Sequence, residues 1–263
     1  MRSSILTLSL FLSSSAFACL SGTGPSKMQD EKIDCVMHTG SIAFKNVTVG
    51  KNFENAGSVD LIDSQIQGAF INTGHVSLDK VSIVGSFVNT GSVELKDSKI
   101  QADFDNTGIV YIENGFVAGD FKNTGKVKLQ NVENLGDIDI TGKFNAWKIK
   151  SKNISIIGQT EFSGQSIVSG NAFVNGDLTA KETIFKDKIE VTAEIVKLYD
   201  SVLAKDIYFR KNKNDKYEQE YLYINNSTVH GNIEFESGKG NVIISNGGKV
   251  KGKIIGASVK NNS

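Results

Sequence analysis

Four pentapeptides near the middle of the chain decide its fold: FINTG at residues 70–74, FVNTG at 87–91, FDNTG at 104–108 and FKNTG at 121–125. Each begins seventeen positions after the one before it, and FENAG at 53–57 precedes them at the same step. The glycine keeps this step over seven positions, which are Gly40, Gly57, Gly74, Gly91, Gly108, Gly125 and Gly142. A fixed period of this length indicates a repeat architecture, in which one structural unit stacks on the next.

Within one repeat, apolar residues alternate with polar ones, which is the period of a β-strand. A strand unit of this length cannot bury its own apolar face, but units stacked in register give each side chain an identical neighbour above and below. The sequence therefore predicts an all-β fold, a parallel β-helix (β-solenoid) with coils of about 17 residues. An antiparallel meander of hairpins is the alternative, and it fits less well because phenylalanine and asparagine each occur once per repeat.

Two kinds of side chain are expected to form ladders through the core. The phenylalanine ladder comprises Phe53, Phe70, Phe87, Phe104 and Phe121. The asparagine ladder comprises Asn55, Asn72, Asn89, Asn106 and Asn123. Each asparagine amide is expected to bond the amide of the next coil. The glycines supply a corner with positive φ, and a second corner is predicted at Asp63, Asp97, Asn114 and Asn131, whose short polar side chains tolerate unusual φ.

The repeat is regular over residues 40–142 and looser over 143–259, which together make up the predicted solenoid domain of about 12 coils. At about 4.8 Å per coil, such a rod would be about 60 Å long. From Phe209 to Leu222 there are 13 steps where the template has four, so nine residues are inserted within Arg210–Tyr221. This polar segment is expected to be a surface loop, which either binds a partner or is a tolerated insertion. Residues 260–263 are predicted to be a tail.

The sequence of the N-terminal segment predicts that the protein is exported. Residues 1–18 have the charge, the short apolar run and the small residues of a secretory signal peptide, and the apolar run is shorter than a membrane span needs. The two cysteines, Cys19 and Cys35, are expected to pair in an oxidising compartment and to staple an N-terminal cap over residues 19–39. Two free thiols, or acylation of Cys19 in a lipoprotein, are the alternatives. We expect a periplasmic, cell-surface or extracellular protein.

Composition argues against several classes of ligand. Lys plus Arg and Asp plus Glu both number 29, so the net charge is zero and neither nucleic acid nor an anionic membrane is favoured as a partner. The three histidines are scattered and have no metal-ligand spacing to the cysteines, so the sequence predicts no zinc site. We expect no cofactor and no catalytic residues.

One column of carboxylates is a candidate metal site. Asp103, Asp120 and Asp137 are expected on one outward column of successive coils, where they could hold a divalent cation such as calcium. The alternative is a solvated acidic face, relieved by Lys122, and it is preferred because the Gly-rich nonapeptide of calcium-binding repeats is absent.

Two resemblances point to exported or polymer-forming solenoids. The runs Val229–Ile233 and Val250–Ile254 resemble the V-x-G-x-I rhythm of bactofilin-type polymer-forming β-helices. The Phe, Asn, Thr, Gly repeats resemble the β-helical shafts of filamentous haemagglutinin-like adhesins. The first resemblance implies filaments formed by end-to-end stacking without catalysis, and the second implies an exported rod.

Together these features predict a non-catalytic structural or adhesin-like binding scaffold, with a carbohydrate or a host or cell-surface protein as its partner. A polysaccharide-active β-helix enzyme is one alternative, and a bactofilin-like filament with end-to-end self-association is another.

Overall fold

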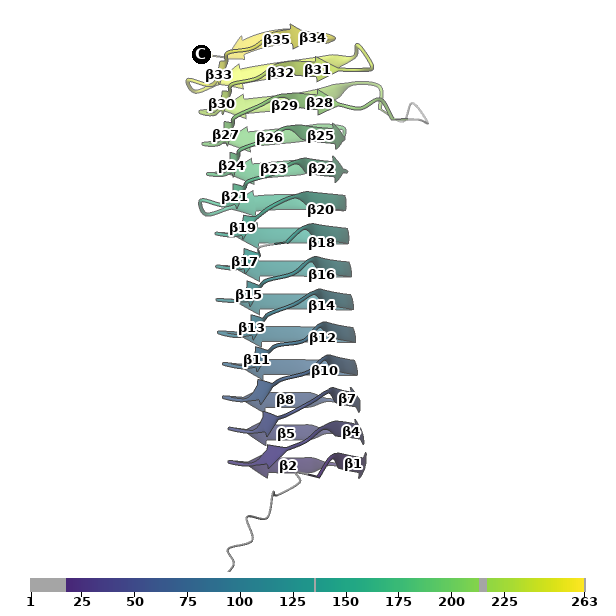
Figure 1. Cartoon of the computed structure of the whole chain (residues 1–263). Coiled ribbons are helices and arrows are strands. Elements are labelled where there is room, and N and C mark those ends of the chain that lie inside the picture. Colours follow the sequence, from purple (N-terminus) through teal and green to yellow (C-terminus); the bar gives the residue numbers. More distant parts are fainter. Residues whose placement is uncertain (1–17, 135, 213–216, 263) are drawn as a thin grey trace, which may run out of the picture.

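A computed structural model describes residues 18–134, 136–212 and 217–262, and all regular elements within these ranges are β-strands. They stack as the rungs of a rod, and each strand pairs in parallel with the equivalent strand of the next coil (Figure 1). The chain is therefore a parallel β-solenoid with coils of about 17 residues, as predicted. None of the described residues forms a helix able to cross a membrane. Of the predicted signal peptide, residues 1–17 lie outside the described residues.

Each coil has three sides, because its longest strand must bend. The strand Phe70–Asp79 has 10 residues and would span about 33 Å if straight. The seven residues left in the coil reach at most about 25 Å, so they could not return to the start of the next strand. The bend lies at Gly74, and the first side precedes it, the second side follows it, and the third side closes the coil.

The strands that form only the first side are β1 (Leu20–Thr23), β4 (Val36–Thr39), β7 (Phe53–Ala56), β22 (Ala172–Asn175), β25 (Ile189–Thr192), β28 (Ile207–Phe209), β31 (Ile233–Phe235) and β34 (Ile254–Ile255). Those of the second side are β2 (Ser26–Gln29), β5 (Ile42–Lys45), β8 (Val59–Ile62), β23 (Leu178–Lys181), β26 (Ile195–Tyr199), β29 (Glu220–Asn225), β32 (Gly240–Ser245) and β35 (Ala257–Asn262). Six strands span both sides without a break, and these are β10 (Phe70–Asp79), β12 (Phe87–Lys96), β14 (Phe104–Glu113), β16 (Phe121–Gln130), β18 (Ile138–Trp147) and β20 (Ile154–Ser163).

The third side consists of two-residue strands that form a separate sheet of 13 strands. They are β3 (Lys32–Ile33), β6 (Thr48–Val49), β9 (Gln65–Ile66), β11 (Ser82–Ile83), β13 (Lys99–Ile100), β15 (Phe116–Val117), β17 (Glu133–Asn134), β19 (Lys150–Ser151), β21 (Ile167–Val168), β24 (Ile184–Phe185), β27 (Val202–Leu203), β30 (Thr228–Val229) and β33 (Lys249–Val250). The first and second sides together form a sheet of 22 strands.

The glycine corner requires glycine for two reasons. The seven glycines from Gly40 to Gly142 have φ between 132° and 142°, which L-residues with a side chain rarely adopt. A Cβ added at Gly108 would also overlap the carbonyl oxygen of Gly91 in the coil below. At the second corner, Asp63, Asp97, Asn114 and Asn131 have φ between 48° and 51°, in agreement with the predicted turn.

The N-terminal segment differs from the prediction in one respect. Residues 19–39, expected to form a cap, carry coil strands from Leu20 onward, because Leu20, Met28 and Ile33 continue the inward phase and pack against the core. The solenoid therefore has about 14 turns, whereas about 12 were expected from the later residues alone. Residues 260–262, expected to be a tail, are the end of β35 and pair with residues 243–245 of β32.

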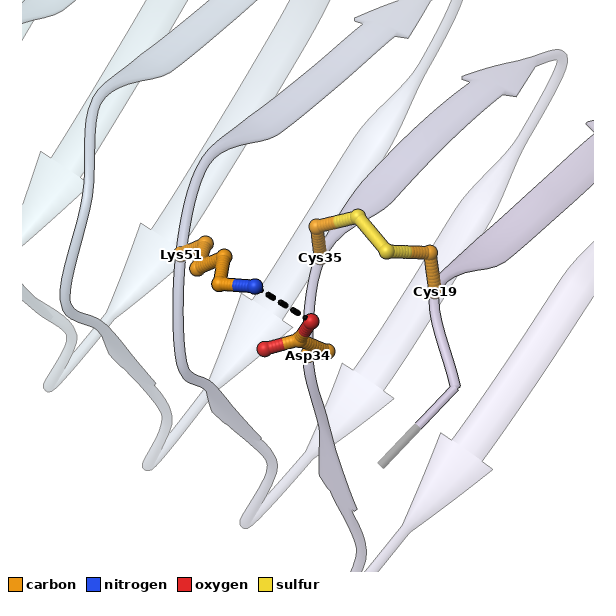
Figure 2. Close-up of a disulfide and its surroundings, with 4 residues drawn as sticks. All are labelled: Cys19, Asp34, Cys35 and Lys51. Atoms are coloured by element: carbon orange, nitrogen blue, oxygen red, sulfur yellow. Dashed lines mark hydrogen bonds and ion pairs between the residues drawn. A yellow bond between two sulfur atoms is a disulfide. The ribbon is translucent and has the colours of Figure 1, made fainter. Parts of the chain in front are cut away.

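The predicted disulfide joins the first two coils. Cys19 and Cys35 are bonded, with Cα atoms 4.4 Å apart, which is close to the spacing of neighbouring strands (Figure 2). In the next coil an ion pair lies at the same corner, between Lys51 Nζ and Asp34 Oδ2 at 2.7 Å. The N-terminal rung is thus held to the rod by a covalent bond in addition to its strand pairing.

Candidate functional site

The phenylalanine ladder lies entirely in the core. The rings of Phe53, Phe70, Phe87, Phe104 and Phe121 are at most 1% exposed, and neighbouring centroids are 4.6–4.9 Å apart with interplanar angles of 2–13°. Ile138 follows Phe121 in register, so the ladder ends there. In later coils Phe144, Phe162 and Phe185 meet edge to face, and Phe209 and Phe235 stack with centroids 4.0 Å apart. Since these rings have no exposed surface, they stabilise the rod and do not offer a ligand a contact.

The asparagine ladder runs beside the rings and is satisfied within itself. From Asn55 to Asn106, each Nδ2 donates to the asparagine Oδ1 of the next coil at 2.8–2.9 Å, and Asn123 is the last acceptor. The same nitrogen also donates to a glycine carbonyl of the previous coil, as Asn72 does to Gly57 O at 3.3 Å. Ile140 follows Asn123 in register, so the ladder ends there. These amides explain why the corner glycine and the asparagine recur together.

The aspartate column is also used structurally. Asp103 Oδ1 accepts a hydrogen bond from the backbone N–H of Asp120, and Asp120 Oδ1 accepts one from Asp137, both at 2.9 Å. Asp137 Oδ1 accepts from Asn153 Nδ2 at 2.9 Å. Each carboxylate therefore fixes the corner of the following coil. Within the described ranges, no three His, Cys, Asp or Glu side chains gather as a metal ion would require.

A groove of about 1250 Å³ runs along the third side, and the sequence did not predict it. Its floor consists of outward side chains from seven successive strands, β13 to β27, which at about 4.8 Å per step extend over about 29 Å. One edge is lined by second-corner residues, all with positive φ, namely Asn114, Asn131, Lys148, Gln165, Glu182 and Asp200.

The groove differs in character along its length. Towards the C-terminus its floor is apolar, because Ile167, Ile184 and Val202 follow one another in register. Ile184 is 40% exposed and Val202 36% exposed, so a partner that covered them would remove apolar area from water. Towards the N-terminus, Lys99 and Lys150 also line it. The groove can therefore hold an elongated partner that has an apolar segment and charged groups.

These floor residues had a signal in the sequence. Once the inward phase is extended past Gly142, Ile167, Ile184 and Val202 fall on outward positions of three successive coils. Ile184 and Val202 are exposed and Ile167 is half-buried, and three such β-branched side chains in register form a patch, whereas single ones carry no information. Ile71 and Val88 are also exposed and adjacent in register, but they lie on the first side and do not line this groove.

The nine-residue insertion lies at the glycine corner between β28 and β29, where Figure 1 shows the chain leaving the rod. Arg210 at its base donates from Nε and Nη2 to Glu190 Oε2 at 3.1 and 2.9 Å, and Lys188 Nζ lies 2.9 Å from Glu190 Oε1. The Lys188 and Arg210 hydrogen bonds lower the pKa of Glu190. At the other end Glu220 is buried and accepts a hydrogen bond from Ser237 Oγ at 2.6 Å. Both ends of the predicted surface loop are therefore anchored to neighbouring coils.

A cluster of tyrosines near the insertion was not predicted either. Five of the six in the chain lie between residues 199 and 223, next to or within the insertion. Tyr221 and Tyr223 project from the second side, with ring centroids 6.2 Å apart and an interplanar angle of 20°. A count of aromatic residues along the chain would have found this cluster.

No protein family, no curated protein and no solved structure matches the chain. The fold and its surfaces therefore carry the functional argument.

Proposed function

We propose that the chain is an exported, non-catalytic β-solenoid that acts as a structural or adhesin-like binding scaffold at the cell surface or in the periplasm. The groove on the third side is its binding face. The single observation that carries this proposal is the in-register stripe of Ile167, Ile184 and Val202 on the floor of a groove of about 1250 Å³. Contiguous apolar surface rimmed by polar residues is typical of interaction sites.

Export is supported by two features of different kinds. Residues 1–18 have the pattern of a secretory signal peptide, and Cys19 and Cys35 are disulfide-bonded. Structural disulfides persist mainly in oxidising compartments. The likeness of the Phe, Asn, Thr, Gly repeats to adhesin shafts agrees with an exported rod.

A scaffold role is supported by how the regular coils use their side chains. Phenylalanine and asparagine fill the interior as ladders, and the aspartate column holds the corners. Repetition of this kind gives a long stiff body on which surface residues can vary from coil to coil. The coils after Gly142 vary most, and they carry the apolar half of the groove and the insertion.

The proposal is tested by fractionation of the source cells together with a binding screen. We expect the chain in the periplasmic or surface fraction, and we expect purified residues 19–263 to bind at least one host-matrix or cell-surface component. Retention in the cytoplasm would contradict export. Release of reducing sugar from a polysaccharide panel would favour the enzyme alternative, and concentration-dependent filaments in electron microscopy would favour the polymer alternative.

A further inference from the structure

A second hollow, of about 250 Å³, lies on the second side and is separate from the groove. It extends over the outward faces of β18, β20, β23 and β26. One outward column crosses it in register, in the order Asn145, Glu161, Thr179 and Lys197, and continues to Tyr223 of β29. The hollow and the tyrosines of the insertion region are therefore parts of one continuous surface. From β18 to β29 this surface extends over about 19 Å.

The hollow contains polar groups without protein partners. Among the described residues, the side-chain amides of Asn145 and Gln159 and the hydroxyl of Thr179 line it, and they make no hydrogen bond to another protein group. Each amide offers two donor hydrogens and a carbonyl acceptor, and the hydroxyl offers one donor and an acceptor. A ligand that presents many hydroxyl groups would match these mixed donors and acceptors.

Tyrosine rings border the hollow at its C-terminal end. Tyr221 follows Ile195 in register, and Lys197 Nζ lies 5.9 Å from the ring centroid of Tyr223. Burial raises the pKa of the Tyr217 phenol, and the carboxylates of Asp177, Glu194 and Glu220 raise it further. Aromatic faces carry partial negative charge and attract C–H groups, as well as supplying apolar area.

The charges of the hollow balance. Lys143 and Lys197 balance the charges of Glu161 and Asp177, so the hollow has no net charge that would favour an acidic or a basic ligand. Free amides, a hydroxyl and aromatic faces at zero net charge match the equatorial hydroxyls and the apolar C–H face of a sugar ring. We propose that the second side from Asn145 to Tyr223 binds a neutral linear oligosaccharide that lies along the rod axis.

The test is calorimetric titration of purified residues 19–263 with neutral hexasaccharides, namely cellohexaose, xylohexaose, mannohexaose, maltohexaose and chitohexaose, and with an oligogalacturonate as the acidic probe. We expect at least one neutral probe to bind and the acidic probe not to bind. Tyr223→Ala and Asn145→Ala should each weaken binding about tenfold or more. Tyr111→Ala is the matched control, because Tyr111 lies in the same column under Lys128, at 5.2 Å, but outside the hollow. It should bind as the wild type does.

Circular dichroism and unfolding midpoints establish that each variant is folded before its affinity is compared. The proposal is overturned if no neutral probe binds at millimolar concentration, if the acidic probe binds instead, or if folded Tyr223→Ala keeps full affinity. This proposal can fail independently of the proposal that the third-side groove binds a partner, because Ile184→Glu on the third side should leave oligosaccharide binding unchanged. A protein that binds at Tyr223 in place of any sugar would likewise contradict it.

Discussion

Asn72 donates a hydrogen bond from Nδ2 to Oδ1 of Asn89 at 2.9 Å, although the two residues lie 17 positions apart in the chain. Both residues are 2% exposed, so water cannot reach their amides and protein groups must supply their hydrogen bonds. Because the same contact recurs in successive coils, removal of one amide leaves the donor of one neighbour and the acceptor of the other unsatisfied. The ladder therefore specifies the register of the coils as well as their stability.

We expect Asn89→Ala to lower the free energy of unfolding by about 2–4 kcal/mol, since it leaves a cavity and breaks two buried hydrogen bonds. Urea denaturation followed by circular dichroism measures this. Thr90→Ala is the control, because Thr90 is exposed beside Asn89, and it should cost less than about 1 kcal/mol. Equal effects of the two substitutions would show that the ladder contributes little.

Two glycine substitutions, one at the glycine corner and one away from it, should differ strongly in stability. Gly108→Ala combines a φ of 139° with overlap of the new Cβ and Gly91 O, and we expect a loss of about 3 kcal/mol or more. Gly50→Ala is the matched control, because the nearest atom to its Cβ would be 3.6 Å away and its φ is not in the left-handed region. Thermal unfolding of the two variants side by side tests the corner. If Gly108→Ala unfolds no more easily than Gly50→Ala, the described corner is wrong.

The disulfide should act locally, because it links only the first two coils. In Cys19→Ser/Cys35→Ser, we expect amide hydrogen exchange to increase over residues 20–33, with protection of residues 70–141 unchanged. The chain-entropy estimate for closing such a loop is about 3 kcal/mol, which bounds the loss. Hydrogen-exchange mass spectrometry measures it. Faster exchange throughout the rod would mean that the first coil nucleates the whole solenoid.

Low pH should weaken the ion pairs of Glu190 at the start of the insertion. Hydrogen bonds from Lys188 and Arg210 hold the pKa of Glu190 below its ordinary value. The ionised Glu190 therefore stabilises the folded chain at any pH above its ordinary pKa, and this stabilisation is lost as the pH falls through the lowered pKa. Both cations are about half exposed, so the effect is at most about 1 kcal/mol. Glu190→Gln should be less stable than the wild type at pH 7, and the difference should shrink by about pH 3. A difference in urea midpoint that is independent of pH would exclude this ion pair as a stabilising contact.

The repeat made most of the fold predictable. Its constant step places Phe70 on Phe87 and Gly74 on Gly91, and the register of the structure follows it residue by residue. The same alternation would have revealed the first coil, but Leu20, Met28 and Ile33 were not recognised because that coil has neither the Phe nor the Asn of the ladders. The end of β35 was missed for a similar reason, since Lys260–Asn262 is polar on both faces.

The candidate binding surfaces were less predictable, because they depend on how outward side chains of different coils combine. The insertion could be located and counted from Phe209 and Leu222. The ion pair between Arg210 and Glu190 joins two coils whose residues at these positions do not repeat, so the sequence could not predict it. The groove combines outward side chains from seven coils, and these residues do not repeat in type from coil to coil. The Asp103 column was read correctly as outward, yet its hydrogen bonds to the next backbone N–H required the corner geometry.

The central claim, that the groove on the third side is the binding face, is tested most directly by one comparison of affinities. Binding of purified residues 19–263 to a cell-surface or host-matrix protein found in the screen would be measured for the wild type, Ile184→Glu and Ile71→Glu. Ile71 is the matched control, because it is 42% exposed on the first side while Ile184 is 40% exposed in the groove. We predict that Ile184→Glu weakens binding about tenfold or more and that Ile71→Glu leaves it unchanged. Full affinity in folded Ile184→Glu, or equal losses in both variants, would contradict the account.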